Sequence, residues 1–514
     1  MKILNYSLNI TTLLFPLVIL NFSASSLAAE RSQEFDLVIA NGRVIDPETE
    51  LDGVRHVGVK DGVITAVSTT PLLDSLSDGG QLIDASNLVV SPGFIDMHAH
   101  GQSQTSNYFQ AHDGVTTALE LESGYVGLKE WLETKKNSSP INFGASVSQR
   151  IGRGLALLDS TVGAQTESEL RQLHYSNGDI AEGRFNLLGD ADYAALTENQ
   201  YPAMRQHLLT GLDEGGIGIG LMPGYTPNVT GGEILDVFQF AAEQEQIIFA
   251  HVRGGGIGAL AMQEVIANTA STGAALHIVH VNSMARGDID MVLQLISGAI
   301  SRSLDISTEV YPYTAASSYI QSSLFDEGWQ DRFGMGYREI QWVATGERLN
   351  KETFDRYRVE GGQVIMYMMQ QDWIDRAVAE PYVMIASDGM PYSPGAHPRS
   401  AGTFSRLLGR YVRERGVLDL TSALRKITLM PAQRLEPYAP AMAKKGRIQV
   451  GYDADITVFD ADRIIDTATF EDDLSYSDGI QFVIVAGTTV IEEGETIADV
   501  FPGQAITGRE FQAR

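Results

Sequence analysis

Two histidines separated by one residue, His98 and His100, end an apolar run that begins at Ser91. In a β-strand, side chains at positions i and i+2 point to the same face, so this pair can bind one metal ion from one side. A His-x-His pair alone is a weak signal, because two unrelated surface histidines give the same letters. The chain holds only 10 histidines in 514 residues, and several of the others also end apolar runs.

Other side chains that can bind a metal or move a proton also end apolar segments: Glu120, Glu122, His251, His280 and Asp388. Singly, a histidine at a strand end is most often a hydrogen-bonded loop residue, and an aspartate before glycine is usually a turn residue. Their recurrence at successive strand ends favours one joint metal site. A zinc-like ion lowers the pKa of its bound water to about 7 and polarises a carbonyl, which is the chemistry of hydrolysis.

The middle of the chain alternates apolar segments with amphipathic stretches such as 233–243 and 291–296. The expected strands are 93–98, 115–121, 142–147, 216–221, 247–251, 275–280, 306–311 and 383–387. Eight strand–helix repeats predict an α/β fold with a parallel sheet, most simply a closed (β/α)8 TIM-like barrel over 91–440. Chemistry in such barrels sits at the carboxyl ends of the strands, where the candidate residues fall. The segment around 320–380 is too long for a plain connection and predicts a lid-like insertion over the active-site mouth.

Both ends of the chain carry short, glycine-punctuated β patterns. Within 30–90, Asn41-Gly42 and Asp61-Gly62 have the form of tight hairpin turns. Short strand patterns return after residue 441. The two segments, 30–90 and 441–514, predict one small β-sandwich domain formed by both chain ends.

The composition excludes several classes of function. The chain has 65 acidic and 37 basic residues, a formal net charge of −28, which argues against binding to nucleic acid and disfavours adhesion to anionic lipid. It has no cysteine, which excludes disulfides, thiolate metal ligands and a cysteine nucleophile. A serine hydrolase is disfavoured because neither a Gly-x-Ser-x-Gly elbow nor a Ser-x-x-Lys motif is present.

Residues 1–29 have the form of a secretory signal peptide. Lys2 gives a positive start, an apolar core follows over 10–20, and Ser26-Leu-Ala28 is a small-x-small cleavage site. The core is too short to span a bilayer comfortably. The sequence thus predicts an exported protein, periplasmic or secreted, with no stable membrane association after cleavage. The alternative is an uncleaved N-terminal membrane anchor.

The order His-x-His, His, His, Asp over the first, fifth, sixth and eighth expected strands resembles the metal-dependent amidohydrolase superfamily, and within it the N-acyl-D-amino-acid deacylase (D-aminoacylase) family. The resemblance runs from Phe35 to Phe459. Its most specific pieces are Ser91-Pro-Gly-Phe-Ile-Asp-Met-His-Ala-His, Gly114-Val-Thr-Thr, Glu309-Val-Tyr-Pro-Tyr-Thr-Ala-Ala-Ser and Ser387-Asp-Gly-Met-Pro.

The resemblance implies roles for individual residues. His251 and His280 are expected to hold a tightly bound metal, and a second position is expected at His98, His100 and Asp388. The resemblance further implies one or two divalent ions, zinc first, with Asp388 as the group that moves the proton. Tyr311, Ser317 and Arg399 match positions that contact the acyl amide and free carboxylate of the substrate. A guanidinium can clasp a carboxylate through two parallel hydrogen bonds, although a salt bridge at the barrel rim is the plainer alternative for Arg399.

Two departures from the family pattern matter. Family members commonly place a cysteine after the second strand as a metal ligand, and some relatives use a carboxylated lysine on the fourth strand. This chain has no cysteine at all, and it has no lysine between Lys136 and Lys351. A carboxylate of the second strand is expected to serve instead: Glu122, nearer the strand end, with Glu120 as the fallback. Where the family often has a lysine after the sixth strand, this chain has Asn282, which leaves the exact substrate open.

The function implied by the resemblance is hydrolysis of the amide of N-acyl-D-amino acids, or of a related small amide that bears a carboxylate. Alternatives on the same scaffold are an isoaspartyl-type dipeptidase and a cyclic-amide hydrolase. The His-Val-Asn sequence at 280–282 also occurs in isoaspartyl dipeptidases. A non-catalytic exported binding protein is disfavoured by the complete ligand set. The expected partner is a small-molecule substrate, with no nucleic acid. The oligomeric state, including a homo-oligomer, stays open.

Overall fold

The computed structural model describes residues 34–158, 163–169, 188–254, 258–472 and 474–511. The predicted signal peptide, 1–29, lies outside the described residues. Within them, no helix has both the length and the apolar character needed to cross a membrane.

Eight parallel strands form the barrel in chain order, as the sequence predicts. They are β6 (Phe94–Asp96), β7 (Val115–Tyr125), β8 (Asn142–Ser148), β9 (Ile219–Leu221), β10 (Ile247–Ala250), β11 (Ala275–Ile278), β12 (Ile306–Val310) and β16 (Val383–Ile385). Every expected strand overlaps one of these. Their side chains are buried on both faces, which explains why the strands read as continuous apolar runs.

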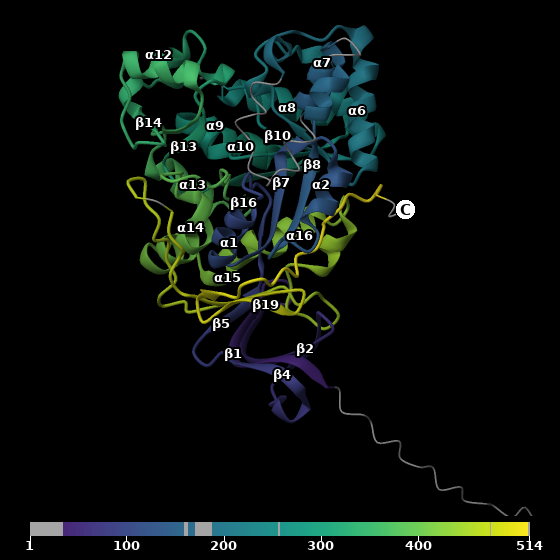
Figure 1. Ribbon diagram of the computed structural model, residues 1–514, viewed down its shortest axis with the longest axis vertical. Helices are drawn as coiled ribbons and strands as arrows, with labels where there is room; N and C mark the ends of the chain where they lie inside the picture. The colour runs from purple at the N-terminus through teal and green to yellow at the C-terminus, as the bar shows by residue number, and fades with distance from the viewer. Residues whose placement is uncertain (1–33, 159–162, 170–187, 255–257, 473, 512–514) are drawn as a thin grey trace, which may run out of the picture.

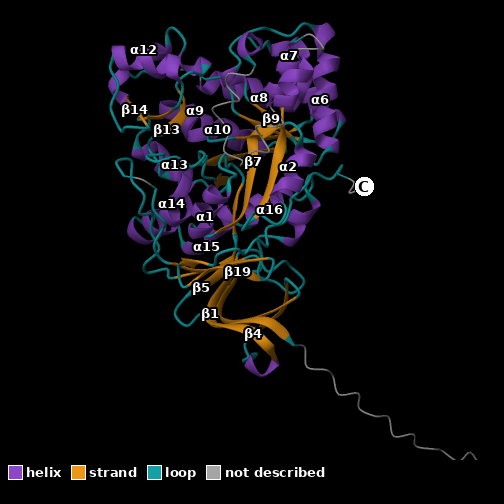
Figure 2. Cartoon of the chain, in the orientation of Figure 1, coloured by secondary structure: helices purple, strands orange, loops and turns teal. Residues whose placement is uncertain are grey.

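Helices alternate with these strands and surround them (Figure 2). The helices of the strand–helix repeats are α1 (Gln104–His112), α2 (Leu128–Lys135), α3 (Gln149–Leu157), α6 (Tyr201–Asp213), α7 (Gly231–Glu243), α8 (Gly258–Thr272), α10 (Ile289–Ile300) and α13 (Gln371–Ala379). The amphipathic stretches that the sequence singled out lie in α7 and α10. Both helices bury their apolar residues in the main hydrophobic core.

The seam between β6 and β16 closes through a few specific contacts rather than a full ladder. The Ser387 amide donates to Asp96 Oδ1 at 3.0 Å, and the His100 amide donates to the Gly389 carbonyl at 2.8 Å. An isolated parallel bridge joins Ala99 and Gly389. Burial raises the pKa of Asp96 to about 6, although hydrogen bonds from Ser387 and the His98 amide lower it. The seam holds β6 and β16 together where both carry metal-site residues at their ends.

A separate three-stranded sheet lies between β12 and β16 at the carboxyl end of the barrel (Figure 1). It contains β13 (Ala316–Tyr319), β14 (Ile340–Trp342) and β15 (Gln363–Met366), with helices α11 (Trp329–Phe333) and α12 (Lys351–Glu360) between the strands. The structure therefore places regular elements over most of the segment in which the sequence predicts an insertion. An aromatic cluster that includes Trp329 and Phe354, stacked at 5.1 Å between ring centroids, gives this unit its own packing.

The two ends of the chain build one mixed sheet of nine strands at the other end of the barrel (Figure 1). The N-terminal strands are β1 (Phe35–Asp46), β2 (Leu51–Lys60), β3 (Val63–Ser68), β4 (Leu76–Asp84) and β5 (Val89–Pro92). The C-terminal strands are β17 (Ile456–Phe459), β18 (Ile480–Val485), β19 (Thr488–Glu492) and β20 (Glu495–Thr496). Because β5 pairs with β1 on one side and β17 on the other, the prediction that both ends share one β unit is confirmed.

One turn expected in this unit is wrong. Asp61-Gly62 joins β2 to β3 as a hairpin turn, but Asn41-Gly42 lies inside β1, where the register with β2 shifts between Ile39 and Gly42. Asn41 has a φ of 63°, so the pair forms a β-bulge and the strand continues. An Asn-Gly pair favours a left-handed backbone, which occurs both in tight hairpin turns and in β-bulges. Here the apolar residues after the pair continue in the same strand, so the pair forms a bulge.

Candidate metal centre

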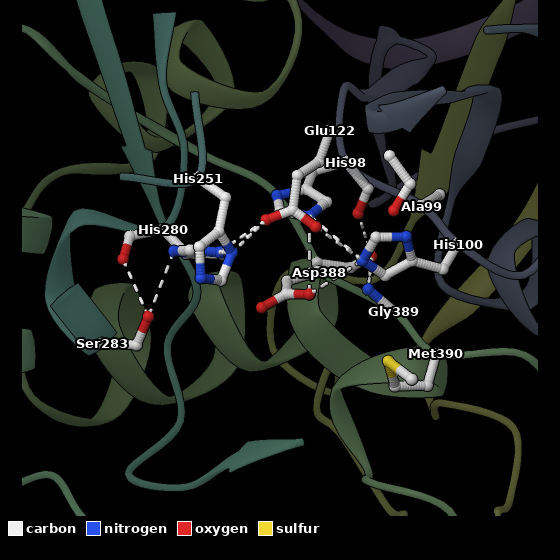
Figure 3. Close-up of polar contacts among 12 residues, drawn as sticks. His98, Ala99, His100, Glu122, His251, His280, Ser283, Asp388, Gly389 and Met390 are labelled. Atoms are coloured by element: carbon white, nitrogen blue, oxygen red, sulfur yellow. Dashed lines mark hydrogen bonds and ion pairs between the residues drawn. The ribbon is translucent and has the colours of Figure 1, made fainter. Parts of the chain in front are cut away.

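The candidate ligands converge from five strand ends of the barrel. His98 and His100 follow β6, Glu122 lies near the end of β7, and His251, His280 and Asp388 follow β10, β11 and β16. All six side chains are buried. Figure 3 shows the carboxylate of Glu122 between the His251–His280 pair and the group formed by His98, His100 and Asp388.

Glu122 contacts both sides of this cluster through different oxygen atoms. Its Oε1 lies 2.7 Å from His251 Nδ1 and 2.8 Å from His280 Nε2. Its Oε2 lies 3.4 Å from His98 Nε2 and 3.3 Å from His100 Nε2. A carboxylate that faces two imidazole pairs in this way can bridge two metal positions.

Asp388 closes the second side. Its Oδ1 lies 3.5 Å from His98 Nε2 and 3.3 Å from His100 Nε2. Its Oδ2 faces the other way, toward Arg399 Nη1 at 2.9 Å. Ligand atoms of His98, His100 and Asp388 all lie within 4.8 Å of one another, and so do those of His98, Glu122 and His280.

The electrostatics of the cluster favour a cation at its centre. Burial alone lowers the pKa of His98 and His100, but the surrounding carboxylates raise both well above the usual value. Burial alone raises the pKa of Glu122, yet the neighbouring imidazoles hold it well below its usual range. Imidazole nitrogens and carboxylate oxygens in this number are the donor set of zinc and similar divalent ions, so these residues fit the metal that hydrolysis needs.

The cluster opens into a cavity between the barrel and the three-stranded sheet. The metal-site residues in its wall are His100, Glu122, His251, His280 and Asp388. The inserted segment contributes Ser317, Tyr319, Phe333 and Met366, among others. A small substrate bound there would lie against the metal centre on one side and against the insertion on the other.

A sequence model of the Amidohydrolase family matches residues 81–491, most of the chain. This chain belongs to the amidohydrolase family.

Two curated relatives come from Alcaligenes xylosoxydans xylosoxydans. A D-aminoacylase is 30% identical over 496 residues, which cover 90% of this chain and 96% of the relative. An N-acyl-D-glutamate deacylase is 27% identical and covers 90% and 94%. Among solved structures, N-acyl-D-glutamate deacylase from Bordetella bronchiseptica, in complex with zinc and a phosphonate inhibitor that mimics the tetrahedral intermediate, superposes with a TM-score of 0.74. It is 25% identical and covers 92% of this chain and 100% of its own.

A second layer of carboxylates orients the histidines of this amidohydrolase. Glu309, in β12, places Oε1 2.5 Å from His98 Nδ1 and Oε2 3.1 Å from His277 Nε2. Glu120 Oε2 lies 2.7 Å from His100 Nδ1. The contacts to Nδ1 of His98 and His100 fix these two rings so that Nε2 faces the metal position. Glu120, the fallback ligand, is thus behind the site, and Glu122 is in it.

Sequence reasoning gave Glu309 no role, although its signal was present. A glutamate in a fully buried strand costs free energy unless a partner inside the barrel neutralises it. Ionic contacts with His98 and His277 lower the pKa of Glu309 to about 2, although burial opposes this shift. Its partners could not be identified from the sequence, because His98 follows β6 and His277 lies in β11, both distant from Glu309 in the chain.

Close approach of the backbone also shapes the site. A Cβ on Gly224 would lie 2.6 Å from His251 Cδ2, and one on Gly220 would lie 2.2 Å from the Glu122 carbonyl oxygen. Gly218 is equally confined, because a Cβ there would lie 2.4 Å from the Ile247 carbonyl oxygen, so these glycines are needed for packing. His280 and Asp388 themselves have positive φ, 31° and 50°. Non-glycine residues in this region are strained, and such strain is concentrated at functional sites.

The three residues expected to contact substrate lie at different depths. Tyr311 and Ser317 line the cavity. The Ser317 hydroxyl donates to the Val364 carbonyl at 3.0 Å, which leaves its oxygen able to accept. Arg399 is 1% exposed and lies behind Asp388, with its guanidinium carbon 4.5 Å from the Tyr311 ring centroid. Its Nε and Nη2 have no hydrogen-bond partner among the described residues.

Asn282, the departure from the family pattern, is fully buried in the short helix α9 (Val281–Ala285). Its Nδ2 donates to the Tyr311 carbonyl at 3.1 Å. It is not among the cavity residues, so it positions the backbone of Tyr311 rather than a ligand.

Proposed function

We propose that this protein hydrolyses the amide bond of N-acyl-D-amino acids, releasing a carboxylate and a free D-amino acid. The observation that carries the proposal is the Glu122-centred cluster of imidazoles and carboxylates in the wall of a cavity. The relatives support the substrate class, because they are named D-aminoacylase and N-acyl-D-glutamate deacylase. The D configuration rests on these relatives alone.

The residues that would hold the cofactor form two overlapping groups around Glu122. His251 and His280 would hold one divalent ion, zinc first, and a second would lie at His98, His100 and Asp388. Bound there, such ions polarise the scissile carbonyl and lower the pKa of the attacking water.

Asp388 is placed to move the proton. Burial favours its neutral form, but the charges of Arg399 and the nearby histidines lower the pKa of its carboxyl below the usual range. An ionised carboxylate can accept the proton of the attacking water. Since Arg399 faces Oδ2, the proton is held at Oδ1 and passes from there to the nitrogen of the departing amine.

Tyr311 is placed to stabilise the oxyanion. Its hydroxyl lies in the cavity wall and has no hydrogen-bond partner of good geometry among the described residues. Burial raises the pKa of Tyr311. The phenol therefore stays protonated at neutral pH and can donate one hydrogen bond to the tetrahedral oxygen.

The free carboxylate of the substrate needs a donor group near Tyr311. Arg399 supplies a positive charge behind the Tyr311 ring, and Ser317 lies at the cavity surface, where its hydroxyl must turn away from the Val364 carbonyl to donate to the substrate. Among the described residues that line the cavity, the only carboxylates are Glu122 and Asp388. A dipeptide with a free ammonium group would thus find no further anion, which favours an acylated amine as substrate.

The test compares metal-depleted and zinc-loaded full-length protein on paired N-acetyl-D- and N-acetyl-L-amino acids, with metals counted per chain. We expect hydrolysis of the D compounds only after loading. Glu122→Gln should lose bound metal, whereas Glu360→Gln, at an exposed position, should not. Faster hydrolysis of β-aspartyl dipeptides or of hydantoin-like rings would replace the proposal with one of those activities.

The proposal also covers location and assembly. We propose export to the periplasm or the medium, because 1–29 has the form of a signal peptide. Terminal sequencing of the exported protein should find a start near Ala28, while an intact N-terminus in the membrane fraction would indicate an anchor. Light scattering would separate a monomer from a homo-oligomer.

A further inference from the structure

His397 lies close to the metal cavity and contacts two neighbouring segments through its two ring nitrogens. Its side chain is fully buried, and it is not among the cavity residues. The Arg399 amide donates to Nδ1 at 3.0 Å, and Nε2 lies 2.9 Å from the Ala315 carbonyl oxygen. Because an amide N–H only donates and a carbonyl only accepts, the ring is the neutral tautomer with its proton on Nε2. Burial and the charge of Arg399 favour this form, since both hold the pKa of His397 well below its usual range.

The first of these contacts fixes the start of α14 (Arg399–Arg406). The first amides of a helix have no carbonyl partner within it and need an acceptor from elsewhere. Pro398, which precedes the helix, has no side-chain acceptor, so the imidazole of His397 serves in its place. Arg399 is thereby held where its Nη1 lies 2.9 Å from Asp388 Oδ2. The position of this guanidinium thus depends on the histidine ring.

The far end of α14 is anchored separately. The buried carboxylate of Asp113 accepts the amides of Phe404 and Ser405, both at 2.8 Å. Loss of the His397 contacts would therefore leave the last turn of the helix in place and release its first turn. That first turn carries Arg399, so the expected movement is confined to the end that faces Asp388.

The second contact of His397 holds the connection between two strands of the carboxyl end. Ala315 lies between β12 and β13, on the connection that starts with Tyr311. The His397 ring also packs on this connection, with its centroid 5.4 Å from that of Tyr313. Tyr311 itself lines the metal cavity. One imidazole thus links the segment that carries Tyr311 to the helix end that carries Arg399.

We infer that His397 is a positioning residue of this active site, which holds Arg399 and Asp388 in the correct place relative to Tyr311. The inference rests on the proposed hydrolysis, in which Asp388 moves the proton and Tyr311 stabilises the oxyanion of the same substrate. Both ring nitrogens are engaged, so His397 acts only through the groups that it holds. A shift of about 1 Å in a reacting group lowers the rate by up to about 10²-fold. The hydrogen bonds of His397 should therefore affect turnover more than substrate binding.

Two pairs of variants, matched in shape, separate the hydrogen bonds from packing. His397→Asn places an oxygen near the position of Nδ1, where it can accept from the Arg399 amide, whereas His397→Leu has the same branching and cannot. His397→Gln places an amide nitrogen near the position of Nε2, where it can donate to Ala315, whereas His397→Met cannot. A purely structural role predicts that the apolar members do at least as well, because the ring packs against Tyr313 and Phe470.

The assay measures kcat and KM of the zinc-loaded full-length protein on the N-acetyl-D-amino acid that is hydrolysed fastest. The kcat of His397→Leu should fall by ~100-fold with KM close to wild type, and His397→Asn should recover ~10-fold or more of this loss. The Gln and Met variants should differ in the same direction, and they decide the question if the first pair does not fold. Equal kcat within both pairs, or a loss that appears only in KM, would overturn the inference.

The same exchange at His112 is the matched control. This ring is also buried and packs on an aromatic ring, that of Tyr476, but it precedes the start of β7, at the other end of the barrel. His112→Leu and His112→Asn should leave kcat unchanged, whatever their effect on the thermal midpoint. A fall in kcat as large as that at His397 would contradict a positioning role, because any buried histidine would then have the same effect.

Crystal structures of the Asn and Leu variants test the geometry without any substrate. The contact between Arg399 and Asp388 should persist in His397→Asn and be lost in His397→Leu, and its persistence in both would overturn the inference. If the wild-type protein hydrolyses no N-acyl-D-amino acid, the proposed function fails. The comparison of the two crystal structures still decides, in that case, whether His397 positions Arg399.

Discussion

Two clusters of buried charge lie at opposite ends of the barrel strands, and they are built from different residues. At the starting end, Lys445 Nζ lies 2.6 Å from Asp455 Oδ2 and 3.0 Å from Asp453 Oδ2, and Asn142 Nδ2 donates to Asp455 at 2.8 Å. At the carboxyl end, Glu122 and Asp388 face four imidazoles. The first cluster contains its own permanent cation and joins the barrel to the nine-stranded sheet.

The difference shows what separates a structural charge cluster from a functional one. In the Lys445 cluster the cation comes from the chain itself, and the two aspartates raise the pKa of Lys445 although burial opposes it. In the metal centre the carboxylates face histidines, whose charge depends on protonation, and a permanent cation has to be a metal ion taken from solution. We therefore expect changes at the carboxyl end to affect metal binding and turnover, and changes at the starting end to affect stability.

The strongest test of this division is Asp388→Asn. The amide cannot accept a proton, so turnover should fall by about 10²- to 10⁴-fold, while the ion held by His251 and His280 and the thermal midpoint stay close to wild type. Steady-state kinetics and metal analysis on the same preparation measure this. Asp213→Asn, at an exposed helix position, is the matched control. Full activity of Asp388→Asn would remove the proton-transfer assignment.

Lys445→Met tests the other end. Removing one partner from a buried ion cluster leaves uncompensated charge, so the free energy of unfolding should fall by about 3–5 kcal/mol. Chemical denaturation measures it, and kcat of the folded protein should not change. Lys351→Met breaks a pair whose lysine side chain is 71% exposed, so the free energy of unfolding should fall far less. Equal costs for the two variants would contradict the comparison.

Glu309→Gln sharpens the comparison within the metal centre. Weakening the contact that orients His98 should lower zinc affinity by about 10- to 100-fold, as measured by competition with a chelator. Ser307→Ala removes the 2.7 Å contact to His277 Nδ1, one residue further from the metal, and should have a smaller effect. If both variants bind zinc like wild type, the second layer does not tune the site.

The smallest expected effect concerns pH at the starting end. Burial lowers the pKa of His112 to about 4, where its ring stacks on Tyr476 with 3.6 Å between centroids. The unfolded chain has a histidine pKa of about 6.5, so it takes up the proton first. The stability that His112 contributes is present above pH 6.5 and is lost as pH falls toward 4, by about 1–2 kcal/mol at pH 5. In His112→Gln, unfolding midpoints should decline less between pH 7 and 5; parallel declines would exclude His112 as the cause.

The sequence predicted the barrel well because its strands are short apolar runs whose polar residues fall at the ends. It also indicated His98 and His100, because they end such a run and the alternation of side chains along a strand places both on one face. It did not indicate Glu309 or Asp96, whose partners come from strands that are distant in the chain. The depth of Arg399 was also not predictable, because whether a side chain lines a cavity or lies behind its wall depends on packing of the loops and not on residue type.

The position of β5 between β1 and β17 has a consequence for synthesis. The register pairs Val89 with Phe459 and Val90 with Val458, so the nine-stranded sheet stays incomplete until nearly the whole chain has been made. The hairpin of β1 and β2 can form early from local contacts, but the edge of β5 then remains unpaired while the barrel is synthesised. This edge, which is prone to pairing with other chains, therefore cannot close before the C-terminal strands have been made.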